Sequence, residues 1–386
     1  MNGVIIIDFT ELKKFLDFIV QWRIPGADCA VYYKNKPVFR YCAGYADIKA
    51  KKPITIDNLY NLYSVTKVIT CTAALQLFEK GKFLMTDPLW EYLPEYKEMY
   101  IQRKIDNDET ELIKAKNSIK VCDLFTMSAG LTYNLNTQPI KSVKEETKGE
   151  CPTREIVKAI AKDPLLFEPG THWNYSLCHD VLGALIEVVS GKKLSEYLEE
   201  NIFKPLEMND TSFYLTEEKK QRMAMQYRFD DLTNTTADVS IKNGYVLGSM
   251  YESGGAGLIS SVDDYIKFAN VLCNKGRTIN GEEILSKHTI DLMKTNRLDE
   301  ILLQDFNWIH MSGYGYGLGV RTLMDRAKAG ALSPIGEFGW GGAAGAYVMI
   351  DPDNELAVFY AQHMLNSQEP FVHPRIRNIT YKCLGN

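Results

Sequence analysis

A serine and a lysine placed three residues apart, Ser64 and Lys67, are the first candidates for chemistry in this chain. They lie where an extended segment meets a long helical pattern, which puts a hydroxyl at a helix N-terminus and an amine one turn later on the same face. The helix is mostly apolar, and desolvation favours the neutral form of an amine. The spacing therefore favours an activated nucleophile with its base, against the alternative that Ser64 only caps the helix.

The same two-residue pattern occurs a second time, at Ser190 and Lys193. Patterns that fix only two positions recur by chance in a chain of this length. Gly191 directly follows Ser190 and is typical of the residue just past a helix end. The second match is therefore interpreted as a solvated turn, and the nucleophile is predicted at Ser64.

Two further segments contain residues that suit acyl transfer. In the first, a Pro-Gly turn leads through aromatic residues to Tyr175 and then to a helix; the structural alternative is a half-buried packing tyrosine. In the second, Trp340, Gly341 and Gly342 lie in a glycine-rich run at a strand edge, where backbone can approach a ligand closely. The alternative there is a simple bend, so neither segment decides a function in isolation.

Other catalytic classes find little support in the sequence. No Gly-x-Ser-x-Gly elbow is present, which disfavours an α/β-hydrolase. The six histidines show no metal-ligand spacing, and no Ser-His-Asp triad is singled out among them. The eight cysteines are scattered singly without a C-x-x-C pair, so neither a metal nor a cofactor is predicted.

Length and composition indicate a globular protein of two lobes. The chain has 386 residues, of which 45% are hydrophobic, and its net charge of −5 without a basic stripe disfavours a nucleic-acid partner. The first eight residues contain only four consecutive apolar ones, too few for a signal peptide, and no run reaches the length of a membrane span. Together with the free thiols, these features predict a cytoplasmic protein without a membrane partner, and leave its oligomeric state open.

Strand patterns gather at the two ends of the chain, whereas helical patterns fill its middle. We expect the terminal strands to join in one antiparallel sheet flanked by helices, which gives an α+β fold with an all-helical lobe inserted. Residues 1–97 and 246–386 are predicted as an α/β lobe and 98–245 as a mostly helical lobe, with the active site in the cleft between them. The polar stretches 102–118 and 136–152 are predicted as loops. The predicted strands are 29–33, 37–41, 315–323, 337–340, 346–350 and 356–362, and the first and last helices are 9–22 and 373–383.

Three motifs in combination indicate a family. Ser-Val-Thr-Lys at 64–67, Tyr-Ser-Leu at 175–177 and Trp-Gly-Gly at 340–342 together resemble the serine β-lactamase and penicillin-binding-protein superfamily. The resemblance is greatest with the class C-like branch that contains the family VIII carboxylesterases. It extends over roughly residues 9–380 and implies a β-lactamase/transpeptidase-like fold. Further matching segments are 81–88, 121–131, 175–183 and 253–258.

The resemblance also implies roles for individual residues. Ser64 would attack an ester or amide carbonyl, and Lys67 together with Tyr175 would take its proton. Which of the two is the formal base stays open, because coupled groups share their titration. The oxyanion hole would consist of the backbone N–H of Ser64 and the N–H of Ala343, just after Trp340-Gly341-Gly342.

Two departures from the family's pattern bear on the substrate. Penicillin-recognising members usually have asparagine where this chain has Leu177, and Lys-Thr-Gly where it has Trp340 and two glycines. The missing lysine and threonine are expected to bind a carboxylate, whereas an indole offers an apolar wall. This favours a carboxylesterase acting on neutral esters with small to medium acyl groups, with Tyr133 and Trp173 as candidates for the acyl pocket.

Two other interpretations remain. A β-lactam hydrolase or a D-amino-acid-specific peptidase would use the same serine on an amide. A catalytically silent binding protein is the third possibility, and it is disfavoured because Ser64, Lys67 and Tyr175 are all present. For the carboxylesterase and for the alternative hydrolases alike, the predicted partner is a small-molecule ester or amide.

Overall fold

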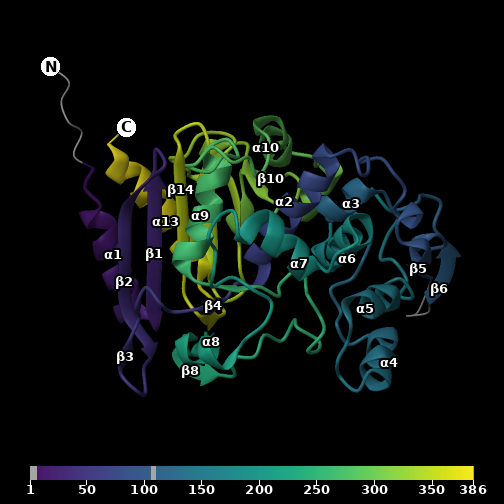
Figure 1. Cartoon of the computed structure of the whole chain (residues 1–386), viewed down its shortest axis with the longest axis horizontal. Coiled ribbons are helices and arrows are strands. Elements are labelled where there is room, and N and C mark those ends of the chain that lie inside the picture. Colours follow the sequence, from purple (N-terminus) through teal and green to yellow (C-terminus); the bar gives the residue numbers. More distant parts are fainter. Residues whose placement is uncertain (1–6, 106–109, 386) are drawn as a thin grey trace.

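The computed structural model describes residues 7–105 and 110–385, and its largest feature is an eight-stranded antiparallel sheet. Because the last long strand pairs with the first, the two ends of the chain meet in the middle of this sheet. Figure 1 shows its long strands next to one another. In spatial order the strands are β10 (Tyr314–Tyr316), β11 (Arg321–Leu323), β12 (Phe338–Gly341), β13 (Tyr347–Asp351), β14 (Leu356–Ala361), β1 (Gly26–Tyr33), β2 (Lys36–Asp47) and β3 (Lys52–Pro53).

Helices cover both faces of the sheet. Helices α1 (Thr10–Trp22) and α13 (Glu369–Leu384) pack together on one face, and α9 (Val262–Cys273) packs on the other (Figure 1). Successive residues of a strand point to opposite faces, so Cys29 and Val31 join the core with α1, whereas Ala30 joins the other core. The sheet therefore has a hydrophobic core on each side, which is why its strands are apolar almost throughout.

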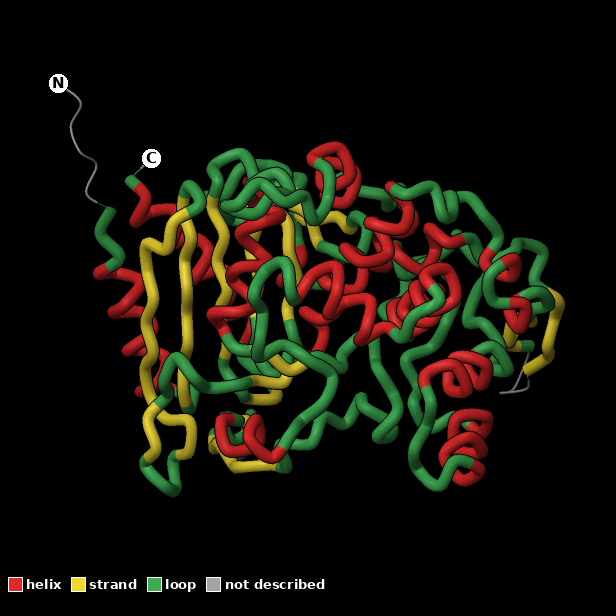
Figure 2. Tube along the Cα trace, viewed as in Figure 1, coloured by secondary structure: helices red, strands yellow, loops and turns green. Residues whose placement is uncertain are grey.

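Helix α2 (Thr66–Glu79) is the link between the sheet and the helical part of the molecule. All its residues from Thr66 to Leu77 are buried, and it packs against α6. A helix that is buried all round needs no amphipathic pattern, which explains why apolar residues lie on every side of it. Figure 2 shows the cluster of helices beyond it, away from the sheet. This region contains α3 (Val121–Phe125), α4 (Gln138–Glu146), α5 (Thr153–Ile160), α6 (Cys178–Ser190), α7 (Leu194–Leu198), β5 (Tyr100–Lys104) and β6 (Thr110–Lys114).

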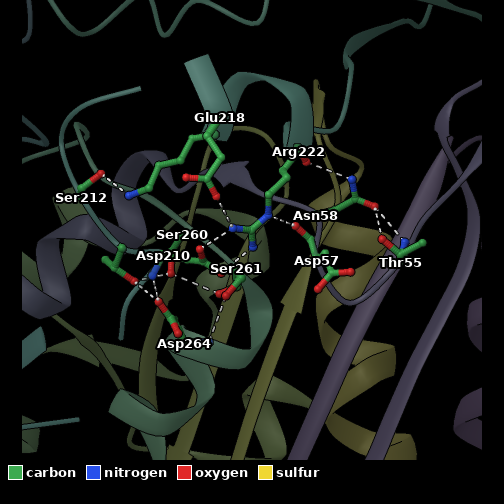
Figure 3. A network of polar contacts seen from close by, with 12 residues as sticks. Thr55, Asp57, Asn58, Asp210, Ser212, Glu218, Arg222, Ser260, Ser261 and Asp264 are labelled. Carbon is green, nitrogen blue, oxygen red and sulfur yellow. Dashed lines mark hydrogen bonds and ion pairs between the residues drawn. The ribbon is translucent and has the colours of Figure 1, made fainter. Parts of the chain in front are cut away.

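A polar network fixes the segment around α8 (Glu217–Arg222) against the rest of the molecule (Figure 3). Arg222 donates two hydrogen bonds of 2.6 Å to the carboxylate of Asp210, and its Nε donates to the main-chain oxygen of Asp57 at 2.9 Å. Asp264, near the start of α9, accepts a bond of 2.7 Å from the backbone N–H of Asp210. Bidentate arginine–carboxylate contacts impose a defined orientation, so this network holds three separate segments in register.

The remaining elements are short. Strand β4 pairs with β9, and β15, β7 and β8 form a small three-stranded sheet. Their bounds, with those of the remaining helices, are β4 (Tyr60–Asn61), β7 (Gln226–Asp230), β8 (Thr235–Val239), β9 (Ile259–Ser260), β15 (Met364–Leu365), α10 (Lys287–Lys294), α11 (Glu300–Phe306) and α12 (Arg326–Ala329).

The predicted antiparallel sheet with flanking helices is confirmed, and three details differ. The strand predicted at 315–323 is two strands, because Gly319 has a φ of +83° in the turn between β10 and β11. The stretch 102–118, predicted as a loop, contains most of the β5–β6 hairpin. The stretch 136–152, also predicted as a loop, contains α4, which buries only Ile140 and Val143. The lobe boundaries after residues 97 and 245 stay a prediction.

Within residues 7–105 and 110–385, no helix has both the length and the apolar character needed to cross a membrane. The prediction that the N-terminus lacks a signal peptide falls mainly on residues 1–6, which lie outside the described residues.

Candidate active site

The backbone around Ser64 turns its side chain out of the core. Tyr63 has a φ of +49°, in the left-handed region that a bulky residue rarely adopts, and a short 3₁₀ turn (Tyr63–Val65) then leads into α2. The hydroxyl of Tyr63 is anchored by donating to Gln226 at 2.6 Å. As a result, Ser64 is the one residue between positions 58 and 77 that is not buried.

The hydroxyl of Ser64 does not cap α2. No side chain accepts a capping hydrogen bond at the start of this helix, and the hydroxyl accepts instead from Nζ of Lys67 at 3.4 Å. The simple capping role considered for Ser64 is therefore not what the structure contains. Ser190, by contrast, lies at the end of α6, before Gly191 with a φ of +72°, and accepts from the backbone of Lys192.

Lys67 is fully buried directly beneath Ser64. Its Nζ donates to the carbonyl of Gly255 at 2.7 Å and to the hydroxyl of Tyr133 at 3.4 Å. It also lies 4.6 Å from the centre of the Tyr175 ring. Lys67 thus has one short hydrogen bond that fixes it and two longer contacts, to Ser64 and Tyr133, along which a proton can move.

Asp180 fixes the loop that holds Lys67. Its carboxylate accepts from the hydroxyls of Tyr251 at 2.8 Å and Ser253 at 2.6 Å, just before Gly255. A Cβ at Gly255 would lie 2.5 Å from Oδ2 of Asp180, so only glycine lets this loop approach closely enough to bind Lys67.

Two tyrosines stack beside Ser64 and differ in where their hydroxyls point. The rings of Tyr133 and Tyr175 are 5.4 Å apart, and the hydroxyl of Tyr133 is the one that contacts Lys67. The hydroxyl of Tyr175 accepts from Nε1 of Trp340 at 3.2 Å. Burial raises the pKa of Tyr133 well above its usual value, with the contact to Ser64 opposing this only in part, so Tyr133 is protonated at neutral pH. The role predicted for Tyr175 with Lys67 stays a prediction.

The glycine-rich segment after β12 lies against the backbone that precedes Ser64. A Cβ at Gly342 would lie 2.3 Å from the main-chain oxygen of Leu62, so the two backbones are in direct contact. The N–H of Gly342 donates to Ala346 at 2.7 Å, which closes a tight turn. Within the described part of the chain, the N–H of Ala343 has no hydrogen-bond partner, which leaves a donor for a developing negative charge.

These segments enclose one cavity of about 280 Å³. The structure brings Ser64, Tyr175 and the predicted segment Trp340–Ala343 together around it, with Lys67 behind Ser64. Trp173 lines none of it and packs behind Tyr175 instead. The lining residues are Ser64, Tyr133, Tyr175, Tyr245, Trp308, Met311, Trp340, Gly341, Gly342, Ala343 and Glu369.

Comparison with known proteins agrees with this arrangement. The protein-family model described as Beta-lactamase matches residues 12–381. The chain belongs to the Beta-lactamase family. It is a serine hydrolase of that family, and its relatives include esterases.

Individual relatives cover most of both chains. Protein Rv1367c of Mycobacterium tuberculosis is 30% identical over 347 residues, which cover 87% of this chain and 85% of that protein. Esterase EstB of Burkholderia gladioli is 27% identical over 359 residues, with the same two coverages. The solved structure of a simvastatin synthase mutant from Aspergillus terreus has a TM-score of 0.82 at 21% identity, covers 100% of both chains and shows the same fold. Because other relatives carry acyltransferase and putative D-alanyl-D-alanine carboxypeptidase names, the family does not fix the substrate.

The sequence left four lining residues of this family member unidentified: Tyr245, Trp308, Met311 and Glu369. None of them lies in a motif, and they come from segments far from Ser64 along the chain. Among these four, only Glu369 lies at a position with a recognisable sequence pattern: it directly precedes a proline, which is typical of the first turn of a helix. Convergence of such distant residues is a property of the packed molecule.

Histidines do not complete the site. Burial lowers the pKa of His179 to about 3, of His363 to about 4 and of His373 to about 3, so all three are neutral at neutral pH. None of them lines the cavity. In the described ranges, no group of three histidine, cysteine, aspartate or glutamate side chains is placed to hold a metal ion.

Proposed function

We propose that this serine hydrolase is a carboxylesterase that forms an acyl-enzyme on Ser64 and acts on esters with small to medium acyl groups. The observation that carries the proposal is the position of Ser64, which is half-buried, contacts Lys67 and lines the same cavity as Ala343, whose N–H is free among the described residues. A nucleophile, a buried amine and an oxyanion donor are the components that acyl transfer needs.

The proposed reaction has two halves. Ser64 Oγ attacks the ester carbonyl and passes its proton to Lys67, directly or through a tyrosine hydroxyl. The N–H groups of Ser64 and Ala343 stabilise the oxyanion, and the alcohol leaves with the proton that Lys67 took from Ser64, returned directly or through the tyrosine hydroxyl. Water then attacks the acyl-enzyme along the same path in reverse, releases the acid and restores the hydroxyl of Ser64.

The walls of the cavity support a substrate without a carboxylate. They contain five aromatic side chains and no lysine, arginine or histidine among the described residues, so nothing offers the charge-assisted bonds that a carboxylate requires. Leu177, at the position of the family's asparagine, is buried and does not reach the cavity. A neutral or apolar acyl group fits such walls better than a β-lactam or a peptide carboxylate.

The experiment compares p-nitrophenyl esters, nitrocefin and D-alanyl peptides on the purified enzyme. Short-chain esters are expected to have the highest kcat/KM, and Ser64→Ala should lower it by at least ~10³-fold. Ser190→Ala is the matched control and should keep full activity, since it alters the other Ser-x-x-Lys pattern. A Ser64→Ala variant as active as the wild type would refute the proposed active site. A kcat/KM tenfold higher for nitrocefin than for the esters would favour the alternative function of a β-lactam hydrolase.

A cytoplasmic location is part of the same proposal. All eight cysteines are free, as expected for a protein in a reducing compartment. This includes Cys29 and Cys42, which lie on neighbouring strands. Cell fractionation with an antibody against the chain tests it, and recovery outside the cytoplasm would refute it.

A further inference from the structure

Glu369 is the one charged side chain among the described residues that line the active-site cavity. It begins α13, and its carboxylate lies beside the end of β12: a Cβ at Gly341 would be 3.7 Å from Oε2. Glu369 also lines two neighbouring cavities, one of about 40 Å³ and one of about 450 Å³. The carboxylate is therefore at their junction, on the substrate side of the oxyanion segment.

No cation of the protein neutralises this carboxylate. Among the described residues, no lysine or arginine lies within 4 Å of it, and His310, 3.4 Å away, forms no hydrogen bond with it. Arg321 and Arg377 line the cavity of about 40 Å³. Arg321 is already paired with Glu337 at 2.9 Å and with the hydroxyl of Tyr347 at 3.1 Å. Arg377 donates to the hydroxyl of Tyr314 at 2.5 Å. Burial accordingly raises the pKa of Glu369, which Arg321 opposes.

The rest of the cavity wall suits a cation. Aromatic faces attract ammonium groups electrostatically, and tryptophan does so most strongly. Trp340 and Tyr175 stack at 5.7 Å, and Trp308 stands edge-on to Tyr175 at 6.3 Å. Tyr245 also lines the cavity, edge-on to Tyr133 at 5.5 Å. The amine of Lys67 is buried behind Ser64 and does not line this wall.

We infer that the enzyme selects esters that carry an ammonium group, held between Glu369 and the aromatic wall formed by Trp308, Trp340 and Tyr245. The inference rests on the proposed esterase function of Ser64 and names its substrate class. A substrate cation supplies the opposite charge that Glu369 lacks in the free enzyme, and a partly buried ion pair is screened less by salt than one on the surface. The same carboxylate repels anionic substrates, which agrees with the absence of a lysine from the third motif.

Two esters of equal shape test the inference. Acetylcholine and 3,3-dimethylbutyl acetate differ only in having a quaternary nitrogen or a quaternary carbon, and a pH-stat follows both at low ionic strength. The kcat/KM of the wild-type enzyme should be about tenfold higher for acetylcholine. Glu369→Gln keeps the shape of the side chain and should bring the ratio close to one. Glu282→Gln removes an exposed charge far from the cavity lining and should keep the wild-type ratio.

The outcomes separate this inference from the proposed function. Hydrolysis of both esters with a wild-type ratio of one or less, or an unchanged ratio in Glu369→Gln, overturns the inference and leaves the esterase proposal intact. If the enzyme hydrolyses neither of these two esters and no p-nitrophenyl ester, both the inference and the esterase proposal are overturned. A measurement on the wild type alone guards against a misfolded variant: tetramethylammonium should inhibit p-nitrophenyl acetate hydrolysis at about one tenth of the concentration that tert-butanol needs. Equal inhibition by the two compounds overturns the inference.

Discussion

Two neighbouring tyrosine residues with different surroundings are the candidates for proton transfer at this site. Tyr133 holds its hydroxyl 3.4 Å from Lys67, whereas the hydroxyl of Tyr175 is bound to the indole of Trp340. The motif comparison indicates Tyr175 as the partner of Lys67, and the geometry adds Tyr133 as a second candidate. Hydrogen bonds in a free enzyme often tighten only when substrate is bound, so both hydroxyls belong in the test.

We expect Tyr133→Phe and Tyr175→Phe each to lower kcat/KM for a neutral ester by about 10²-fold or more, because each removes a hydroxyl from the proton path. The kcat/KM of the wild type should rise from acid toward neutral or mildly alkaline pH. His179, His363 and His373 have pKa values of about 3 to 4 and cannot produce that rise.

The control is His172→Asn, since His172 is half-exposed, pairs with Asp305 and does not line the cavity. This variant should keep both the rate and the pH profile. If it loses the acid limb while both tyrosine variants behave as wild type, a histidine is the base and the proposed mechanism is wrong.

At the scale of elements, the turn between β12 and β13 must press against the segment that carries Ser64. Gly342 allows this contact, since any side chain there would meet the main-chain oxygen of Leu62. The glycine therefore positions the N–H of Ala343 relative to Ser64, and the distance between two backbones determines whether an oxyanion hole exists.

Gly342→Ala should lower kcat by about 10²-fold or more with a smaller effect on KM, because displacement of one oxyanion donor acts on the transition state. Gly244→Ala is the matched control: a Cβ there meets nothing within 4 Å, and its φ is not in the left-handed region. Steady-state kinetics on p-nitrophenyl acetate, with thermal unfolding to verify folding, measure both variants. A Gly342→Ala enzyme with wild-type kcat would refute the predicted oxyanion segment.

At the scale of the whole molecule, burial of three histidines makes the fold sensitive to acid. Their pKa values are lowered from 6.5 to between about 3 and about 4, so the unfolded chain binds protons below pH 6.5 that the folded chain does not. Stability is fully present above pH 6.5 and is lost as the pH falls, by about 1.4 kcal/mol per pH unit for each histidine. Asp28 acts oppositely: burial raises its pKa to about 6, so its contribution increases as the pH falls from 6 toward 3.8.

The sum predicts that the free energy of unfolding falls by roughly 5 kcal/mol between pH 7 and pH 5. Urea unfolding at the two pH values measures it. His363→Asn should reduce the loss by about one third, since His363 accounts for one of the three groups. His288 is exposed, so His288→Asn should leave the pH dependence unchanged. Equal stability at pH 5 and pH 7 would contradict the prediction.

The sequence by itself predicted most of the elements and a candidate nucleophile, because both depend on local patterns. Alternating and apolar runs predict strands in any compact fold, and a serine one turn before a lysine at a helix start is a short-range signal. Polar, exposed elements were missed for the same reason: β6 and α4 bury few side chains, so their patterns resemble loops.

Only the tertiary structure decided what surrounds the nucleophile. Tyr133, Tyr245, Trp308 and Glu369 come from four segments with no common motif, and Trp173, an equally good candidate by sequence, packs behind the wall. The direction of the Tyr175 hydroxyl is likewise fixed by Trp340, which lies 165 positions away. Local periodicity fixes which face of an element is buried, whereas the identity of the residue across a cavity depends on how distant elements pack. A local motif is thus enough to predict the nucleophile, whereas only the folded structure shows which residues line the cavity around it.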